Sequence, residues 1–310
     1  MLSPVPARRP ATSLAGSACR RAASIQVTPL LSLRRAFSSS LVDPDSTSSA
    51  APEHVGQKKD PFPPPPSRWI ADLRARIGKC LAFGCNAQQI SLAAEVLRAL
   101  ATEWKGLLAG SDGFLTGGRR GLDGQQIAWG EMDSFQHVNN VNYFRYAESA
   151  RVNWITNFAV HVDPQHRRQW RELMTPRSTG LIMRSLKADF KFPMVYPDRI
   201  SVYHRLRARP ERDPAPSAFA LDCIVLSHRH RRIASRLEED IVLYDYKKAG
   251  KTGMPDFMLD LFERTWELQQ QETRRARMRI FALHGDVAQL EAETWNRPDA
   301  VEDIGAARGT

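Results

Sequence analysis

Apolar residues first recur at helical spacing just after a proline-rich stretch. Trp69, Ile70, Leu73 and Ile77 form one stripe that begins after Ser67, a plausible N-cap. A second stripe runs from Asn86, with Gln89 three residues on as in a capping box, to Leu108. Gly and Asp residues at 110–113 end it. Residues 67–110 are therefore predicted to form a pair of helices.

The spacing of apolar residues changes in the middle of the chain. Phe219, Leu221, Cys223 and Val225 alternate as in a half-buried strand. Similar strand patterns occupy residues 125–129, 181–192, 199–207, 218–227 and 233–244. One amphipathic helix lies between the first and second strands, with its stripe at Tyr143, Ala147, Ala150, Trp154 and Phe158. This order predicts an α+β fold in which an antiparallel sheet wraps around one long central helix.

Helical patterns return after Pro255. They predict one helix from Asp256 to about Ala282 and another from Asp286 to Trp295, separated at Gly285. The stretch from Gln269 to Arg279 is nearly all polar, so we expect it to face solvent or a partner and not the core.

The composition of the chain is most informative at the N-terminus. Residues 1–40 contain six arginines and eight serines but no Asp or Glu, and without them the net charge of +10 falls to +4. Such a segment is typical of a mitochondrial transit peptide, and the matrix is the expected location. No apolar run is long enough to span a membrane, and the charge of the body gives no reason to expect a nucleic-acid partner. The four cysteines have no metal-site spacing, so we expect reduced thiols.

The stretch from Trp129 to Arg151 carries the candidate chemistry. It places the carboxylate of Asp133 after a strand, then a short polar turn, and then Asn139 and Asn140 at the start of the central helix. Free backbone N–H groups at a helix start can stabilise the oxyanion that forms when a thioester carbonyl is attacked. A carboxylate across that carbonyl can deprotonate a water or attack directly.

The order Asp133, a short turn, then His137-Val138-Asn139-Asn140 and Tyr143 resembles the 4-hydroxybenzoyl-CoA thioesterase branch of the hot-dog superfamily. It is also similar to plant acyl-carrier-protein thioesterases. The resemblance covers about residues 120–250 and implies an acyl-CoA or acyl-carrier-protein thioesterase of the hot-dog fold. We therefore expect a fungal-type mitochondrial member of this group with no cofactor and no metal, forming a homodimer or higher homo-oligomer.

The resemblance assigns roles to individual residues. It implies that Asp133 is the catalytic base or nucleophile and that the backbone N–H of Asn140 polarises the carbonyl. His137 either takes part in catalysis or only shapes the turn. Phe135 and Gln136 depart from the two branches, which leaves the carrier open. The expected substrate-binding residues are Asn139, Tyr143, Lys187 and Arg231.

Other interpretations remain beside this one. Glu148 could be a second acid, but we expect it to pair with Arg151 or Arg145. The basic residues at 228–232 could bind CoA phosphates or an acidic carrier, or could be a solvated turn. A hot-dog hydratase and a serine hydrolase lack their signatures here. A non-catalytic acyl-binding or scaffold protein is the remaining rival.

The expected domain plan follows from these patterns. It comprises a transit peptide (1–40), a Pro/Ser-rich linker (41–66), a helical extension (67–114), the hot-dog domain (115–250) and a C-terminal helical extension (251–310).

Overall fold

A computed structural model describes residues 62–117 and 120–302, all within one unit of the chain, Lys58–Thr310. The predicted transit peptide lies outside the described residues, as does the predicted linker except for 62–66. The helices are α1 (Trp69–Ala82), α2 (Ala87–Thr102), α3 (Trp104–Gly110), α4 (Asn140–Asn157), α5 (Arg167–Glu172) and α6 (Asp256–Glu293). The strands are β1 (Leu122–Gln126), β2 (Thr179–Phe190), β3 (Arg199–Leu206), β4 (Ala218–Ser227), β5 (Arg232–Asp245) and β6 (Gly250–Lys251).

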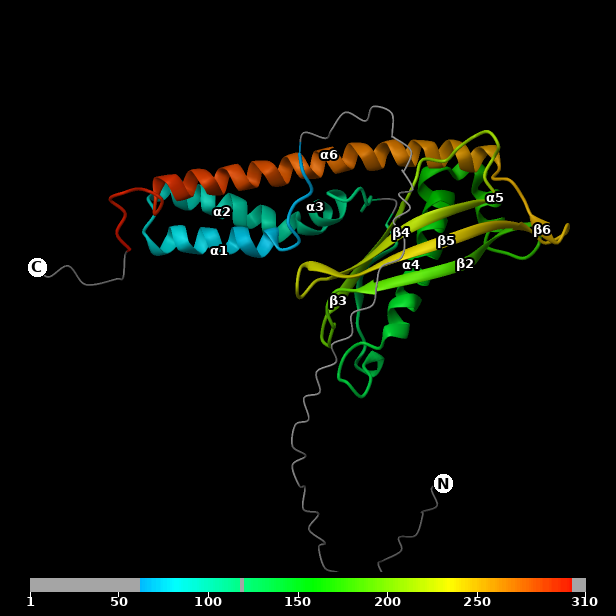
Figure 1. Cartoon of the computed structure of the whole chain (residues 1–310), viewed down its shortest axis with the longest axis horizontal. Coiled ribbons are helices and arrows are strands. Elements are labelled where there is room, and N and C mark those ends of the chain that lie inside the picture. The colour runs from blue at the N-terminus through cyan, green and yellow to red at the C-terminus, as the bar shows by residue number, and fades with distance from the viewer. Residues whose placement is uncertain (1–61, 118–119, 303–310) are drawn as a thin grey trace, which may run out of the picture. The chain divides into compact units, whose positions relative to one another are not determined.

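The strands form one antiparallel sheet in the order β1-β3-β4-β5-β2, and β6 pairs with the end of β5 (Figure 1). The helix α4 packs on one face of this sheet, where Tyr143, Ala147 and Ala150 meet the buried side chains of Val202 and Val225. The alternation in β3 and β4 places these side chains on the inner face. The prediction of an antiparallel sheet around one central helix is confirmed, and this is the hot-dog fold.

The connection from α4 to β2 contains structure that the sequence patterns did not predict. A π-helical turn (Phe158–Val162), a 3₁₀ turn (Pro164–His166) and α5 follow α4. The carboxylate of Asp163 accepts a hydrogen bond from the indole of Trp170 and contacts the ring of His166 at 3.0 Å. The ring of Trp170 then packs on Phe158 in the core. These contacts fix the segment that leads into β2.

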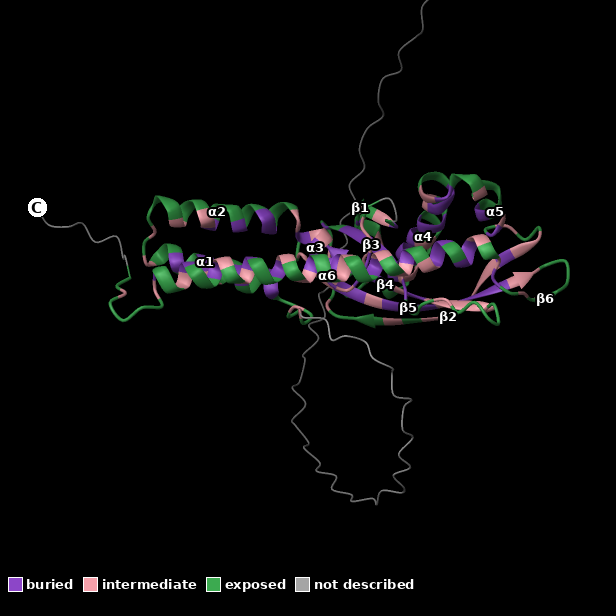
Figure 2. Ribbon diagram, turned by 90° about the horizontal axis from the view of Figure 1, so that it is seen from above, coloured by how far each residue is buried: buried purple, intermediate pink, exposed green. Residues whose placement is uncertain are grey.

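The helical extension has its own core. Buried residues of α1, α2 and α3 pack against the C-terminal part of α6 and against the outer face of the sheet at Tyr203, Ile224 and Leu226 (Figure 2). We predicted two helices here, and the structure has three. The second apolar stripe is divided at Glu103 into α2 and α3. The division lets Trp104 turn toward the sheet, where its ring meets that of His228 edge-on at 5.3 Å.

For the C-terminal extension, one prediction is wrong and another holds for most of its residues. The structure has one helix, α6, where we expected a break at Gly285. A glycine inside a helix costs about 1 kcal/mol, but Leu283, Val287 and Leu290 are buried against the extension, and this packing outweighs that cost. The polar stretch from Gln269 to Arg279 is partly or fully exposed as expected, apart from the buried Gln269 and Ala276.

Gln269, at the start of that polar stretch, is buried. Its side-chain amide accepts a hydrogen bond from the backbone N–H of Leu206 at 2.9 Å and donates one to the carbonyl of Leu206 at 3.0 Å. A glutamine thereby completes the backbone pairing at the end of β3.

The first strand ends earlier than predicted. We expected a strand over 125–129, but β1 ends at Gln126 and residues Trp129–Glu131 form a 3₁₀ turn before Asp133. Across residues 62–117 and 120–302 we find no helix with the combination of length and hydropathy that crossing a bilayer requires.

Candidate active site

The turn that carries Asp133 is closed by backbone pairing. Met132 and Val138 form an antiparallel bridge, and the N–H of Asp133 donates to the carbonyl of His137 at 2.9 Å. Within the loop, one carboxylate oxygen of Asp133, Oδ1, accepts the N–H of Phe135 at 2.9 Å. Gln136 adopts a left-handed conformation with φ of 62°. The carboxylate is thereby oriented, and its Oδ2 has no hydrogen-bond partner among the described residues.

The start of α4 supplies a different set of groups. Asn139 is the N-cap, and its side chain accepts the N–H of Val141 at 3.0 Å. The N–H of Asn139 itself donates to the carbonyl of Glu131 at 2.9 Å. The N–H of Asn140 has no acceptor within the described part of the chain. We expected Asn139 to bind the substrate, but its N–H is already used, whereas that of Asn140 is available.

These two features border one cavity of about 520 Å³. Polar groups on its wall come from the turn and the helix start, and apolar groups come from α4 and from the end of β2 with the segment after it. The lining residues are Asp133, Phe135, His137, Val138, Asn139, Asn140, Tyr143, Phe190, Lys191, Phe192 and Pro193. A carboxylate, an unused backbone N–H and an apolar wall therefore share one space.

Most of the residues that the sequence singled out lie together there. Asp133, His137, Asn139, Asn140 and Tyr143 all line the cavity. The imidazole of His137 is exposed and has no hydrogen-bond partner in the described regions. The phenol of Tyr143 is buried, which raises its pKa, and its ring meets Phe190 edge-on at 5.0 Å.

Lys187 and Arg231 do not reach this cavity. The Lys187 side chain is 75% exposed, and its ammonium lies 3.7 Å from the carboxylate of Glu238. Arg231 lies in the turn between β4 and β5 and lines a separate cavity. Lys191, in the segment after β2, is the lysine that borders the cavity of Asp133.

The aromatic wall was missed by the sequence analysis. Phe190, Phe192 and Pro193 follow one another at the end of β2, and no motif marks them. Only the alternation of side chains along β2 could have indicated Phe190. Leu186 and Ala188 pack toward the core, and Phe190, two residues further on, faces the same side of the strand.

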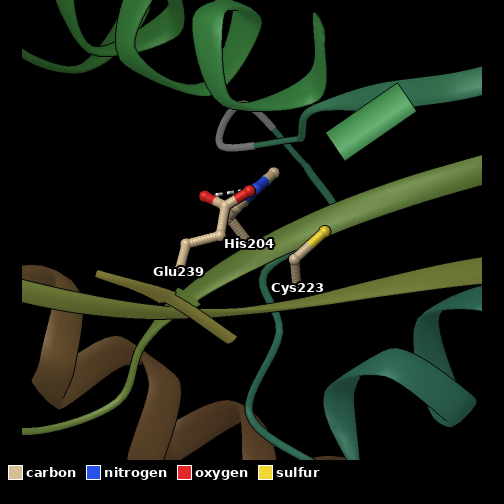
Figure 3. Close-up of side chains that lie close together, drawn as sticks. All are labelled: His204, Cys223 and Glu239. Atoms are coloured by element: carbon tan, nitrogen blue, oxygen red, sulfur yellow. Dashed lines mark ion pairs between the residues drawn. The ribbon is translucent and has the colours of Figure 1, made fainter. Parts of the chain in front are cut away.

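A second cluster of titratable groups lies buried under α4, and sequence analysis did not identify it. His204, Cys223 and Glu239 come from the neighbouring strands β3, β4 and β5 and point into the same space (Figure 3). Their potential ligand atoms all lie within 4.8 Å of one another. The imidazole Nε2 of His204 is 3.3 Å from a carboxylate oxygen of Glu239.

Arg151 of α4 supplies a positive charge to this cluster. Its guanidinium donates to the other oxygen of Glu239 at 2.9 Å. Burial opposes the charge of Glu239, but His204 and Arg151 outweigh it and lower the pKa of that carboxyl. Burial and the nearby carboxylate raise the pKa of the Cys223 thiol well above its ordinary value, which disfavours the thiolate that a metal ion requires. The cluster is therefore best described as a charged core network with a guanidinium as its cation.

Arg151 also corrects one expectation. We expected Glu148 to pair with Arg151 or Arg145 on the same helix. Arg151 pairs across the core with Glu239, whereas Arg145 contacts the side chain of Asn142 at 3.5 Å. Glu148 is exposed on α4 and does not line the cavity.

Comparison with known proteins gives a family and a set of structural neighbours. Residues 127–262 match the model of the thioesterase-like superfamily. A putative thioesterase from Pseudomonas aeruginosa, PA2801, is 21% identical, with 45% of this chain and 95% of that chain covered and a TM-score of 0.36. YbaW, a probable thioesterase from Escherichia coli, is 17% identical, with coverages of 46% and 96% and a TM-score of 0.37.

A thioesterase from Thermus thermophilus, complexed with coenzyme A and Zn, is 16% identical, with coverages of 48% and 93% and a TM-score of 0.35. No curated protein matches the chain. The family match includes the whole turn, α4 and the sheet from β2 to β5. Residues 127–262, less than half of the chain, therefore have the hot-dog fold and match the thioesterase-like superfamily.

Proposed function

We propose that this protein is a mitochondrial thioesterase that hydrolyses the thioester of an acyl-CoA or an acyl-carrier protein. One observation carries the proposal: the carboxylate of Asp133 and the unused N–H of Asn140 border the same cavity. An acyl group bound against Tyr143 and Phe190 would place its carbonyl between them.

The mechanism follows from these two groups. The carbonyl oxygen accepts a hydrogen bond from the N–H of Asn140, which stabilises the negative charge that forms on attack. Asp133 either removes a proton from the attacking water or attacks the carbonyl to give an anhydride that water then hydrolyses. In both routes the carbon–sulfur bond breaks, the products are a carboxylic acid and a thiol, and the sulfur takes up a proton as it leaves.

The test is release of free thiol from a panel of acyl-CoAs and acyl-carrier proteins. Asp133→Asn removes the base and the nucleophile, so we expect hydrolysis to fall by at least roughly 100-fold. Glu148→Gln is the matched control, because it neutralises an exposed carboxylate on the adjoining helix α4 outside the cavity. Wild-type rates in Asp133→Asn, at an unchanged melting temperature, would refute the mechanism.

A homo-oligomer is part of the proposal. The strand β2 pairs only with β5 and forms an edge of the sheet in the described chain. Near the active-site turn, the side chains of Trp129, Phe135 and Val141 are 73%, 80% and 60% exposed, which is unusual for large apolar groups so close together in the chain. Both features support a second subunit beside this region. Light scattering coupled to size exclusion would give the mass in solution.

The mitochondrial location rests on residues 1–40 alone. Their arginines and the absence of acidic residues support import. A fluorescent protein carrying residues 1–40 should enter mitochondria, and the same fusion with the six arginines changed to glutamine should stay outside.

A non-catalytic acyl-binding or scaffold protein is the second candidate. The helical extension favours it, since α1–α3 and α6 form a separate core that the family match does not include in full. This candidate predicts that acyl-CoA binds without hydrolysis and that Asp133→Asn leaves binding unchanged.

A further inference from the structure

Five arginines gather around a second cavity of about 250 Å³. Arg68 directly precedes α1 and Arg74 lies in it. Arg229 and Arg231 lie in the turn between β4 and β5, and Arg232 begins β5 at the end of that turn. No acidic residue lines this cavity. Within residues 62–117 and 120–302, none of the five forms an ion pair. This differs from the neighbouring strands, where Arg205, Arg207 and Arg236 all contact carboxylates.

The turn that presents three of these arginines is held by buried side chains. Asp198 accepts the N–H of Arg229 at 2.9 Å and the hydroxyl of Ser227. The hydroxyl of Ser227 in turn accepts the N–H of His230 at 3.1 Å. Ser227 and Asp198 are both buried. The carboxylate of Asp198 thus binds the backbone and hydroxyl groups of the turn and not a guanidinium. In the described chain the five guanidinium groups of the cavity have no acidic partner.

A third cavity, of about 320 Å³, shares lining residues with both the arginine cavity and the cavity of Asp133. It shares Lys191 and Phe192 with the cavity of Asp133, and it shares Ser67, Arg68 and Arg232 with the arginine cavity. The guanidinium of Arg232 lies over the ring of Phe192, 3.8 Å from its centre. Phe192, on the wall of the cavity of Asp133, is thus in contact with Arg232, on the wall of the arginine cavity.

We propose that the arginine cavity binds the phosphates of coenzyme A while the thioester lies at Asp133, so that the substrate is an acyl-CoA and not an acyl-carrier protein. This inference rests on the proposed function. Coenzyme A carries a pyrophosphate and a ribose phosphate at the far end of its pantetheine arm, and guanidinium groups match phosphate oxygens in geometry and charge.

The inference also assigns a role to the helical extension. Arg68 and Arg74 lie outside the family match, which begins at residue 127. The extension would complete the nucleotide site by placing α1 opposite the β4–β5 turn. Substrate selection would then depend on residues that the hot-dog domain does not contain.

The test compares two substrates that differ only in the nucleotide. The kcat and KM of the wild type, Arg74→Ala and Arg229→Ala are measured with an acyl-CoA and with the same acyl group on pantetheine. Each substitution should raise the KM for acyl-CoA by roughly tenfold, the loss of one charge-assisted contact, and leave the kcat and the pantetheine KM unchanged. Both arginines are exposed, so the variants should fold. Arg98→Ala, an exposed arginine on α2 outside these cavities, is the control.

Several outcomes would overturn the inference while leaving thioester hydrolysis intact. These are equal KM values of the wild type for the two substrates, equal effects of the arginine variants on both, or hydrolysis of acyl-carrier protein alone. If no thioester is hydrolysed, the proposed function fails, and calorimetry with coenzyme A decides the inference separately. Binding that Arg74→Ala and Arg229→Ala weaken supports the phosphate site, and the absence of binding overturns it.

Discussion

The guanidinium of Arg151 donates a hydrogen bond of 2.9 Å to the carboxylate of Glu239, which joins the central helix α4 to β5 in the middle of the sheet. The carboxylate is fully buried, and the arginine side chain is 14% exposed. Removing one member of a buried pair leaves the other charge without compensation. This contact is therefore expected to matter more for stability than the many ion pairs on the surface.

We predict that Arg151→Met lowers the free energy of unfolding by about 3–5 kcal/mol, because Glu239 loses its guanidinium partner in the core. Arg145→Met is the control, since Arg145 is exposed on the same helix and pairs with no carboxylate in the described chain. Urea denaturation of both variants measures the difference. Equal stability of the two would contradict this account of the cluster.

The pair of Arg151 and Glu239 should also make the stability of the fold depend on pH. The pKa of Glu239 is lowered from its ordinary value of 4.5 in the folded protein, so the unfolded chain binds the proton more readily. The stability from this group is fully present above pH 4.5 and is lost as the pH falls through the lowered pKa. The difference in unfolding free energy between the wild type and Arg151→Met should therefore shrink below pH 4.5. A difference that stays constant or grows on acidification would show that the pair is not responsible.

The candidate catalytic residues could be grouped from the sequence because they are neighbours in the chain. Asp133, His137 and Asn140 lie within one closed turn and one helix start, and local backbone pairing alone brings them together. Lys187 does not line this cavity because side chains alternate between the two faces of a strand. Leu186 and Ala188 pack toward the core, so Lys187 between them points to the other face of β2.

Long-range partners could not be predicted in this way. Glu239 is 88 residues from Arg151, and nothing in the local spacing of α4 indicates it. Gly285 likewise signalled a helix end, but buried neighbours from α1–α3 stabilise a continuous α6. Helix-end residues in the sequence do not predict the structure where packing with distant segments contributes more free energy than local helix propensity.

Gln269 offers a test of one such distant contact. We predict that Gln269→Leu destabilises the protein by about 2–4 kcal/mol, because the buried N–H and C=O of Leu206 each lose a hydrogen-bond partner. Gln270→Leu, an exposed position next to it on α6, is the matched control. Thermal unfolding compares the two. A loss in Gln269→Leu no larger than in Gln270→Leu would mean that this backbone contact adds little.

The role of a backbone amide in catalysis can be tested at Asn140 because of where it lies. Asn140 is the first residue of α4, a position where proline is tolerated, since its N–H has no partner within the helix. Asn139 before it has φ of −59° and ψ of 138°, the extended conformation that a following proline requires. Asn140→Pro therefore removes the N–H of this residue with little strain, and Asn140→Ala removes the side chain but keeps the N–H.

We expect Asn140→Pro to reduce kcat by roughly 100- to 1,000-fold, the loss observed when one oxyanion donor is removed. Asn140→Ala should retain kcat within a few-fold of the wild type, because the carbonyl oxygen of the substrate still has its donor. Thiol release under saturating acyl-CoA measures both, and melting temperatures establish that both variants fold. If the proline variant turns over substrate as fast as the alanine variant, the amide at the start of α4 does not stabilise the oxyanion, and another donor on the cavity wall must do so.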